Sequence, residues 1–397
     1  MFFMSKNLVT DTLTLRHGAV LSNRIVMSPM QTLSGKRNGF ASADTIAYYA
    51  ARSQAAGMII AEYHYVSPNG GPCSTPGYPE QLAAYSDEHL DGLRQVAQAI
   101  KKDGNKALLQ IHHGGRAAIG QALSGQEVVA PSQLDFPFLD YPVRELTNEE
   151  IEAIIADFGQ ATKRAIEAGF DGVEIHGANH YLLQQFFSSY SNRRTDQWGG
   201  SLEKRMAFPL AVVKEVKRIA KAFAKKEFII GYRISPEEIH GETIGYTYQE
   251  STQLVAKIVE QEIDYIHLSL FEGYNSKPKN SDLSYAEHFK KVLDDQTKLI
   301  IVCGVTSQEQ AQDAVANYSD LIAIGRGTLI EPQFAKKIME GKGETILHQI
   351  SPETLAYTQL TPGLKEAFTR EDHLGLPPLP GGESIRPFHT GQFDMFN

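Results

Sequence analysis

Cysteine is almost absent from this sequence of 397 residues. The two cysteines, Cys73 and Cys303, lie far apart and form no C-x-x-C pair. A disulfide framework, a structural zinc site and an iron–sulfur cluster all need several cysteines at short spacing, so the sequence predicts none of them. Free cysteines favour a reducing, cytoplasmic location.

Long apolar runs and an excess of positive charge are also missing. No stretch approaches the roughly 18 to 20 apolar residues of a membrane-spanning helix, and the first residues contain no basic leader. The formal net charge of −9 argues against a nucleic acid or an anionic membrane as partner, because both attract clustered Lys and Arg. A small molecule is the expected ligand.

The sequence is rich in alternating strand and helix patterns, and its 42% hydrophobic content is ample for a large core. Eight stretches have the β-branched pattern of strands: 25–30, 58–66, 106–112, 172–177, 228–235, 265–270, 298–305 and 321–325. Helical patterns separate or follow them at 43–56, 87–102, 147–169, 202–224, 248–261, 285–293, 307–316 and 332–340. Eight β-α units predict the α/β class and a (β/α)8 TIM barrel.

Segments before and after these units predict two additions to the barrel. Alternating residues around His17 and Gly18 indicate an N-terminal β-hairpin, a lid over one barrel end. Residues 341–397 become rich in Pro and Gly, which indicates an extended C-terminal arm that packs on the barrel or at an interface. We therefore expect a barrel with its hairpin over 1–340 and an extension over 341–397.

The stretch from Asp171 to Gly200 passes from an apolar strand into a polar cluster. It reads DGVEIHGANHYLLQQFFSSYSNRRTDQWGG, and His176, Asn179 and Tyr181 follow its β-branched residues. Because ligands bind at the carboxyl ends of barrel strands, we expect this trio at a site.

Polar residues also end the two strands beside this one. Gln110 and Arg233 come late in their strands, as His176 does, and alternate residues of a strand face the same side. Any one of them alone is explained equally well as a buried polar group that bonds to neighbouring backbone. The three together favour a site at one barrel mouth.

Glycines follow the last two strands, at the common phosphate-binding place of such barrels. Gly304 precedes Val305, and Gly325 precedes Arg326, whose guanidinium suits phosphate oxygens. An ordinary surface arginine is the alternative for Arg326. Pro29, near the end of the first predicted strand, is explained by a turn that ends the strand.

Two carboxylates and two adjacent histidines need separate interpretations. Glu174 and Glu62 are interpreted as structural partners of inward cations rather than as catalytic groups. His112 and His113 point to opposite faces of a strand, and no carboxylate follows at a ligand spacing. The sequence therefore predicts no metal site.

The motifs, in their order, resemble the old yellow enzyme family of FMN-dependent NADH:flavin oxidoreductases. The resemblance runs from Leu21 to about Phe334 and is carried by LSNRIVMSPM, HHGGR after the Gln110 strand, VEIHGANHYLLQQFFSSYSNRRTDQWGGSLEKR, GYRISP, CGV and IGRG.

The resemblance implies FMN lying across the barrel mouth. Its phosphate would be held by Gly304, Val305, Gly325 and Arg326, and its ring would be held by Pro29, Met30, Gln31, Tyr63, Gln110 and Arg233. The implied reaction is a ping-pong reduction of activated alkenes (enones, enals, maleimides or nitroalkenes), with NADH or NADPH as hydride donor. His176 and Asn179 would grip the substrate oxygen, and Tyr181 would donate the proton.

Several residues depart from the family pattern. Gln31 stands where many relatives have Thr or Cys, which puts the redox poise in doubt. Asn179 stands where some relatives have His, and His180 stands where Gly is usual, which places a bulky group near the pocket. Trp198 replaces a frequent Tyr, and Arg386 is a candidate for an arginine that completes a partner's pocket.

Three alternatives remain open at this point. An NADH oxidase-like flavoenzyme would use oxygen or a quinone as acceptor. A flavin-binding sensor would not turn over NAD(P)H, and a barrel acting on a phosphorylated metabolite would bind no flavin. A homo-oligomer is also open.

Overall fold

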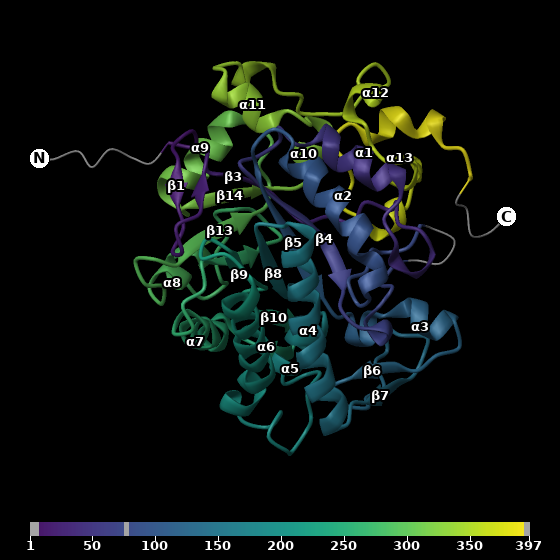
Figure 1. Cartoon of the computed structure of the whole chain (residues 1–397), viewed down its shortest axis with the longest axis vertical. Helices are drawn as coiled ribbons and strands as arrows, with labels where there is room; N and C mark the ends of the chain where they lie inside the picture. Colours follow the sequence, from purple (N-terminus) through teal and green to yellow (C-terminus); the bar gives the residue numbers. More distant parts are fainter. Residues whose placement is uncertain (1–7, 75–78, 393–397) are drawn as a thin grey trace, which may run out of the picture.

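Eight parallel strands close into a barrel in the structure, a computed structural model that describes residues 8–74 and 79–392 (Figure 1). Neighbouring strands are parallel throughout, and the closed order is β12-β13-β14-β3-β4-β5-β8-β9. The strands are β3 (Ile25–Met27), β4 (Met58–Tyr65), β5 (Lys106–His112), β8 (Gly172–Gly177), β9 (Ile229–Ile234), β12 (Tyr265–Ser269), β13 (Lys298–Val302) and β14 (Leu321–Ile324). The predicted (β/α)8 barrel is confirmed.

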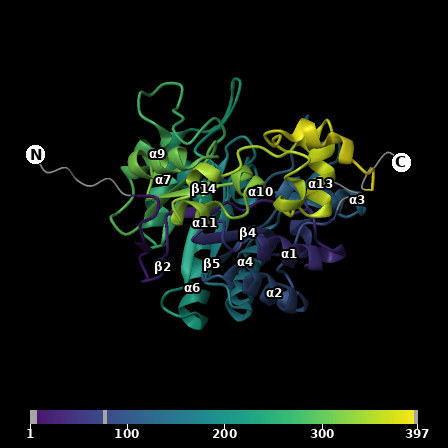
Figure 2. The same cartoon turned by 90° about the horizontal axis from the view of Figure 1, so that it is seen from above.

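A helix follows each barrel strand and covers the outside of the sheet (Figures 1 and 2). The α4 helix shows why local sequence sets the ends: Thr147 and Glu150 form a reciprocal capping box, and Gly169 closes the helix at φ 87°. The helices that follow the strands are α1 (Ala43–Ala51), α2 (Leu90–Lys101), α4 (Asn148–Ala168), α6 (Leu202–Phe223), α7 (Tyr248–Val259), α8 (Tyr285–Lys290), α9 (Gln308–Asn317) and α10 (Arg326–Ile330).

Two predicted strands extend too far at their carboxyl ends. The strand predicted to reach residue 305 ends at Val302, because Cys303 and Gly304 turn the backbone to φ 135° and 78°. The first strand ends at Met27, two residues before Pro29. Both shortened ends leave loops at the barrel mouth.

The N-terminal hairpin pairs β1 (Leu13–Thr14) with β2 (Val20–Leu21). Leu15 and Leu21 are buried in one cluster with Met58 and Tyr265, which stand at the amino ends of their strands. The predicted lid therefore closes the amino end of the barrel, opposite to the mouth where the polar residues gather.

Short elements in the mouth loops were not predicted. β6 (Val128–Ala130) pairs with β7 (Val143–Glu145), and β10 (Glu238–His240) pairs with β11 (Thr243–Tyr246) in an antiparallel hairpin. Two short helices, α3 (Ile119–Leu123) and α5 (Leu182–Phe187), also lie in these loops. Strands of three or four residues are too short for a reliable periodic signal.

The C-terminal segment folds against the barrel on the side away from the hairpin β1–β2 (Figures 1 and 2). After α11 (Phe334–Met339) it contains α12 (Leu355–Thr358) and α13 (Pro362–Thr369), two helices that the sequence analysis missed. Thr361 Oγ1 donates to the carbonyl of Thr32 at 2.5 Å. The division at residue 340 and any role of the arm at an interface stay predictions.

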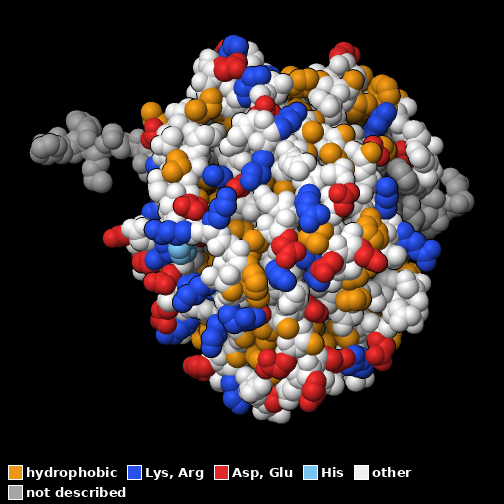
Figure 3. Space-filling view, viewed as in Figure 1, with side chains coloured by type: hydrophobic (Ala, Val, Ile, Leu, Met, Phe, Trp, Pro, Cys, Tyr) orange, Lys and Arg blue, Asp and Glu red, His pale blue; other side chains and the backbone are white. Residues whose placement is uncertain are grey.

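Surface charge is mixed rather than concentrated on the face in Figure 3, where basic and acidic side chains alternate. Within 8–74 and 79–392, none of the helices is long and apolar enough to cross a bilayer. The cytoplasmic location stays a prediction.

Candidate active site

The three polar residues predicted to converge are neighbours in the barrel sheet. Gln110 of β5 is in register with Glu174 of β8, and His176 of β8 is in register with Arg233 of β9. All four side chains are buried. The strands therefore bring the predicted residues to one mouth of the barrel.

Glu174 accepts hydrogen bonds from three buried side chains at the base of the barrel mouth. It accepts hydrogen bonds from Gln110 Nε2 at 2.7 Å, Tyr265 OH at 3.0 Å and His267 Nδ1 at 2.8 Å. Burial opposes ionisation of Glu174, but the charge and hydrogen bond of His267 outweigh it and lower the pKa of the carboxyl. Glu174 thus holds Gln110 and His267 in fixed orientations.

Glu62 has no cationic partner among the residues that the structure describes, in contrast to the expectation. Its carboxylate accepts hydrogen bonds from the Thr32 backbone at 3.1 Å and the Thr32 hydroxyl at 2.5 Å. Burial raises the pKa of Glu62 to about 7, and the two hydrogen bonds from Thr32 offset only part of this effect. The prediction failed because the alternation of side chains along a strand indicates that Glu62 points into the barrel but not which groups it contacts there.

His176 is held as a neutral hydrogen-bond donor. Its Nδ1 accepts from the Ala178 backbone at 3.3 Å, so the proton of the neutral ring sits on Nε2. Burial, and after it the nearby His112 and Arg233, lower the pKa of His176 well below its usual value. The ring is thus free to donate through Nε2.

Asn179 is oriented by a relay from Arg233. Arg233 donates to Ser269 Oγ at 3.1 Å, and Ser269 donates to Asn179 Oδ1 at 2.9 Å. Because the amide oxygen is engaged, the Nδ2 donor is turned away from Ser269. Asn179 also takes a left-handed backbone, with φ 56°, which Asn tolerates better than most residues.

Tyr181 lies among the rings of the site. Its ring centroid is 5.0 Å from that of His176, 4.2 Å from that of His112 and 5.6 Å from that of Tyr63. Desolvation by these neighbours raises the pKa of Tyr181 well above its usual value. The hydroxyl therefore keeps its proton at neutral pH.

His180, the bulky residue between Asn179 and Tyr181, lies on the wall of a cavity of about 680 Å³. The cavity extends from Ser269 over the hairpin β10–β11. A space of this size suits a small organic molecule.

Buried polar atoms without a protein partner mark where a cofactor fits. Within the described residues these include Gln31 Nε2, Gln110 Oε1, Arg233 Nε and His267 Nε2. Donors and an acceptor in this arrangement suit the carbonyl and N–H edge of a flavin ring, and unpaired they would cost about 1–3 kcal/mol each. The ring side of the predicted FMN site therefore fits.

Of the two loops predicted for the phosphate, the first is the more open to an anion. A Cβ on Gly304, which has φ 78°, would have Gly273 Cα as its nearest neighbour at 3.9 Å, whereas a Cβ on Gly325 would be crowded by Met30 Sδ at 3.3 Å. The side chain of Val305 is buried. Arg326 donates to the Pro378 carbonyl at 2.8 Å, which ties this loop to the C-terminal segment.

The segment after β3 and the strand β4 meet through a side-chain bond. Tyr63 OH donates to Gln31 Oε1 at 3.0 Å, which leaves Gln31 Nε2 as the free donor. The Tyr63 carbonyl accepts from Gln81 at 2.7 Å, so this backbone group is already engaged. Pro29, Met30 and Gln31 keep their predicted place at the mouth, and their roles toward FMN stay predictions.

The sequence analysis missed Ser269 and His112. Ser269 follows His267 by two residues at the end of β12, and His112 follows Gln110 by two at the end of β5. The period of two that identified Gln110 could have found both. His112 was considered only as a metal ligand, and its ring instead packs against Tyr181.

The barrel mouth combines unpaired polar atoms that suit the edge of a flavin ring, a neutral histidine donor and a protonated tyrosine. These features are those of a flavin-dependent oxidoreductase. The model of the NADH:flavin oxidoreductase / NADH oxidase family matches residues 13–344, and the chain belongs to this family. This confirms the resemblance to old yellow enzymes. FMN is the cofactor, and NADH or NADPH is the electron donor.

Individual relatives agree in sequence and in fold. The probable NADH-dependent flavin oxidoreductase YqiG of Bacillus subtilis (strain 168) is 40% identical over 338 residues, which cover 85% of this chain and 89% of that protein. The NADH:fumarate oxidoreductase of Klebsiella pneumoniae (strain 342) is 38% identical over 347 residues, 85% of this chain but only 36% of that longer protein. The structure of morphinone reductase with tetrahydroNAD superposes with a TM-score of 0.73 at 27% identity, over 90% of this chain and 97% of that one.

Proposed function

We propose that this oxidoreductase reduces alkenes conjugated to an electron-withdrawing group, such as enones, enals, maleimides and nitroalkenes. One observation carries the proposal. The rings of His176 and Tyr181 lie 5.0 Å apart, and His176 and Asn179 are oriented by hydrogen bonds that leave their donors free.

His176 and Asn179 serve as the oxygen-binding pair. As a hydride reaches the β-carbon of the alkene, negative charge builds on the carbonyl or nitro oxygen. Nε2 of His176 and Nδ2 of Asn179 are fixed donors that stabilise this charge without reorganising. FMN, when bound at this mouth, would supply the hydride, with NADH or NADPH as the electron donor.

Tyr181 supplies the proton that completes the reduction. Its protonated hydroxyl donates to the α-carbon, so the double bond gains one hydride and one proton. Its raised pKa keeps the proton in place until the α-carbon becomes basic.

The name of one relative supports the substrate class. Fumarate, in the name of the Klebsiella enzyme, is an alkene activated by carboxyl groups. The alignment covers only 36% of the Klebsiella protein. The name of that protein therefore supports alkene reduction by this chain but does not identify the substrate.

The proposal is tested by reoxidation of the reduced protein. Protein reduced without oxygen by one equivalent of NADH is mixed with 2-cyclohexenone, N-ethylmaleimide, a nitroalkene or air-saturated buffer, and flavin absorbance is followed. At least one alkene should reoxidise the protein faster than oxygen and give the saturated product. Fast reoxidation by oxygen or a quinone, with no alkene consumed, would instead support an NADH oxidase-like enzyme.

A further inference from the structure

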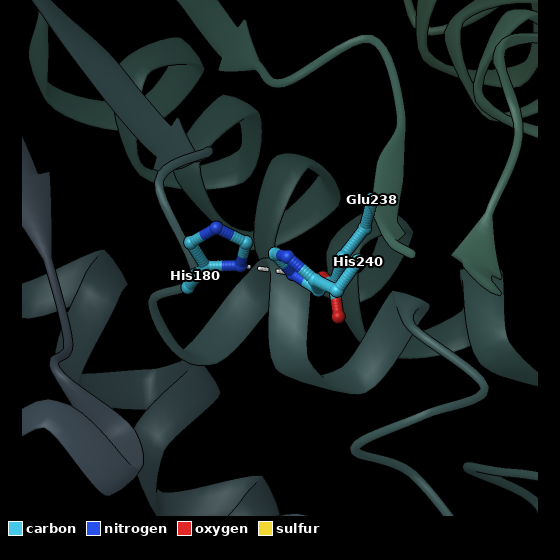
Figure 4. A group of neighbouring side chains, drawn as sticks. All are labelled: His180, Glu238 and His240. Atoms are coloured by element: carbon cyan, nitrogen blue, oxygen red, sulfur yellow. Dashed lines mark ion pairs between the residues drawn. The ribbon is translucent and has the colours of Figure 1, made fainter. Parts of the chain in front are cut away.

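A second group of side chains lies beside the trio and has no role in the proposed reaction. His180 comes from the loop after β8, and Glu238 and His240 come from β10 (Figure 4). Each offers one ligand atom, and the three atoms lie within 4.8 Å of one another. All three residues line the cavity of about 680 Å³.

Glu238 is a buried carboxylate with fixed orientation. Its residue is 2% exposed, Oε1 accepts from Ser188 Oγ at 2.8 Å, and Oε2 accepts from Gln184 Nε2 at 2.7 Å. Hydrogen bonds of this kind hold a metal-binding carboxylate in place before the ion arrives.

Among the described residues Glu238 has no direct ion pair with Lys or Arg, although the buried Arg116 interacts with its charge at longer range. Within the described ranges, its one ion-pair partner is His180, at 3.5 Å. A buried carboxylate without a Lys or Arg partner favours a cation close by.

The backbone aims His180 at Glu238. His180 has φ 63°, and its N–H donates to Gln184 Oε1 at 3.0 Å while its carbonyl accepts from Gln185 Nε2 at 2.7 Å. The rings of His180 and His240 lie beside each other in Figure 4, with centroids 5.2 Å apart and ring planes tilted by 42°. His240 stands next to the turn of the hairpin and is exposed.

The spacing suits a small divalent ion. Ligand atoms roughly 2.0–2.2 Å from a tetrahedral zinc ion lie about 3.4 Å apart, close to the 3.5 Å between His180 Nδ1 and Glu238 Oε2. His240 is near the tip of a short exposed hairpin and has to move by up to about 1.4 Å, from 4.8 Å to about 3.4 Å, to complete the set. Gln184 Nε2, 3.2 Å from His180 Nδ1, then gives up that contact and keeps Glu238.

We propose that His180, Glu238 and His240 form a binding site for a zinc ion at the wall of this cavity, beside the candidate active site. Two imidazoles and one carboxylate select a first-row transition metal over Mg²⁺ or Ca²⁺, which prefer oxygen ligands. Three protein ligands leave at least one coordination position, and it is reached from the cavity that the ligands line.

Zinc binding to the flavin-loaded protein tests this inference. The protein is dialysed against micromolar zinc chloride in a non-chelating buffer, and bound zinc and flavin are measured per chain. The wild type should bind one zinc ion. His240→Ala, at an exposed position, and Glu238→Gln, which keeps hydrogen-bonding groups, should each weaken binding by at least about tenfold with flavin content unchanged.

A matched control is available in the chain. His389 pairs with the buried Glu366 at 3.0 Å, yet this pair belongs to no three-ligand group among the described residues. His389→Ala should bind zinc as the wild type does. The inference is overturned if the wild type takes up no zinc, if His240→Ala binds it with wild-type affinity, or if His389→Ala loses it.

Discussion

Removal of the Tyr181 hydroxyl should affect only the alkene-reducing half of the proposed reaction. Tyr181→Phe keeps the ring contacts with His112 and His176 but has no proton to give. We expect alkene reduction to slow by about 10²–10⁴-fold and flavin reduction by NADH to stay within about threefold. Stopped-flow measurement of the two half-reactions separates these effects.

Tyr318→Phe is the matched control, because Tyr318 caps α9 away from the mouth. It should leave both half-reactions unchanged. Equal slowing of both half-reactions by Tyr181→Phe would assign Tyr181 to ring packing rather than to proton donation.

The acid–base states of His176 and Tyr181 predict a flat pH profile. The lowered pKa of His176 extends its neutral form below the usual 6.5, and the raised pKa of Tyr181 extends its protonated form above the usual 10.0. The rate of alkene reduction should therefore not change through either group between about pH 6 and pH 10. A step near pH 6.5 that disappears in His176→Gln would contradict the neutral assignment.

At the scale of elements, two substitutions in the hairpin β1–β2 test whether it closes the amino end of the barrel. Leu21 is fully buried at the amino end of the barrel, and its neighbour Val20 is 53% exposed. Leu21→Ala should lower the free energy of unfolding by about 2–5 kcal/mol, and Val20→Ala should change it by less than about 0.5 kcal/mol.

Urea unfolding measures both hairpin variants, and the flavin spectrum of each should match the wild type because the plug lies at the end opposite to the site. Similar stability losses in the two variants would show that the hairpin does not pack into the barrel as described.

The loops at the barrel mouth were harder to predict from the sequence than the strands and helices of the barrel. The helices and strands of the barrel were predicted from local patterns such as the capping box of Thr147 and Glu150. The hairpin β10–β11 has three and four residues in its strands and was missed. It nevertheless supplies two of the three residues of the proposed zinc site, so the least predictable element carries the new chemistry.

At the scale of the whole molecule, Arg52 joins the barrel to the C-terminal segment. Its side chain is fully buried and donates to the carbonyls of Thr358 at 2.7 Å and Gln359 at 3.3 Å. Arg52→Met should lower the free energy of unfolding by about 3 kcal/mol or more, because several buried carbonyls lose their donor. Urea unfolding checks the loss.

Limited proteolysis adds a readout specific to this contact. In Arg52→Met the segment from Leu355 to Thr369 should be cut faster than in the wild type, and Arg52→Lys should be intermediate because an ammonium cannot reach all the acceptors. Unchanged cleavage together with unchanged stability would show that the segment is held by other contacts.

The sequence by itself determined the barrel and the convergence of Gln110, His176 and Arg233 at one end of it. Strand period, helix caps and turn glycines are local, and the inward parity of Gln110, His176 and Arg233 follows from a repeat of two residues. A closed parallel barrel then leaves one mouth for these strand ends.

Tertiary structure alone decided how the groups are oriented and charged. The bond of Ala178 to His176, the relay from Arg233 through Ser269 to Asn179, and the failure of Glu62 to meet a cation depend on contacts that no strand pattern specifies. His180 and His240 are far apart in the sequence and meet only because the loop after β8 and the hairpin after β9 fold over one cavity. The periodicity of a strand determines whether a side chain points into the barrel or away from it. Only the packing of the whole chain determines which groups that side chain contacts.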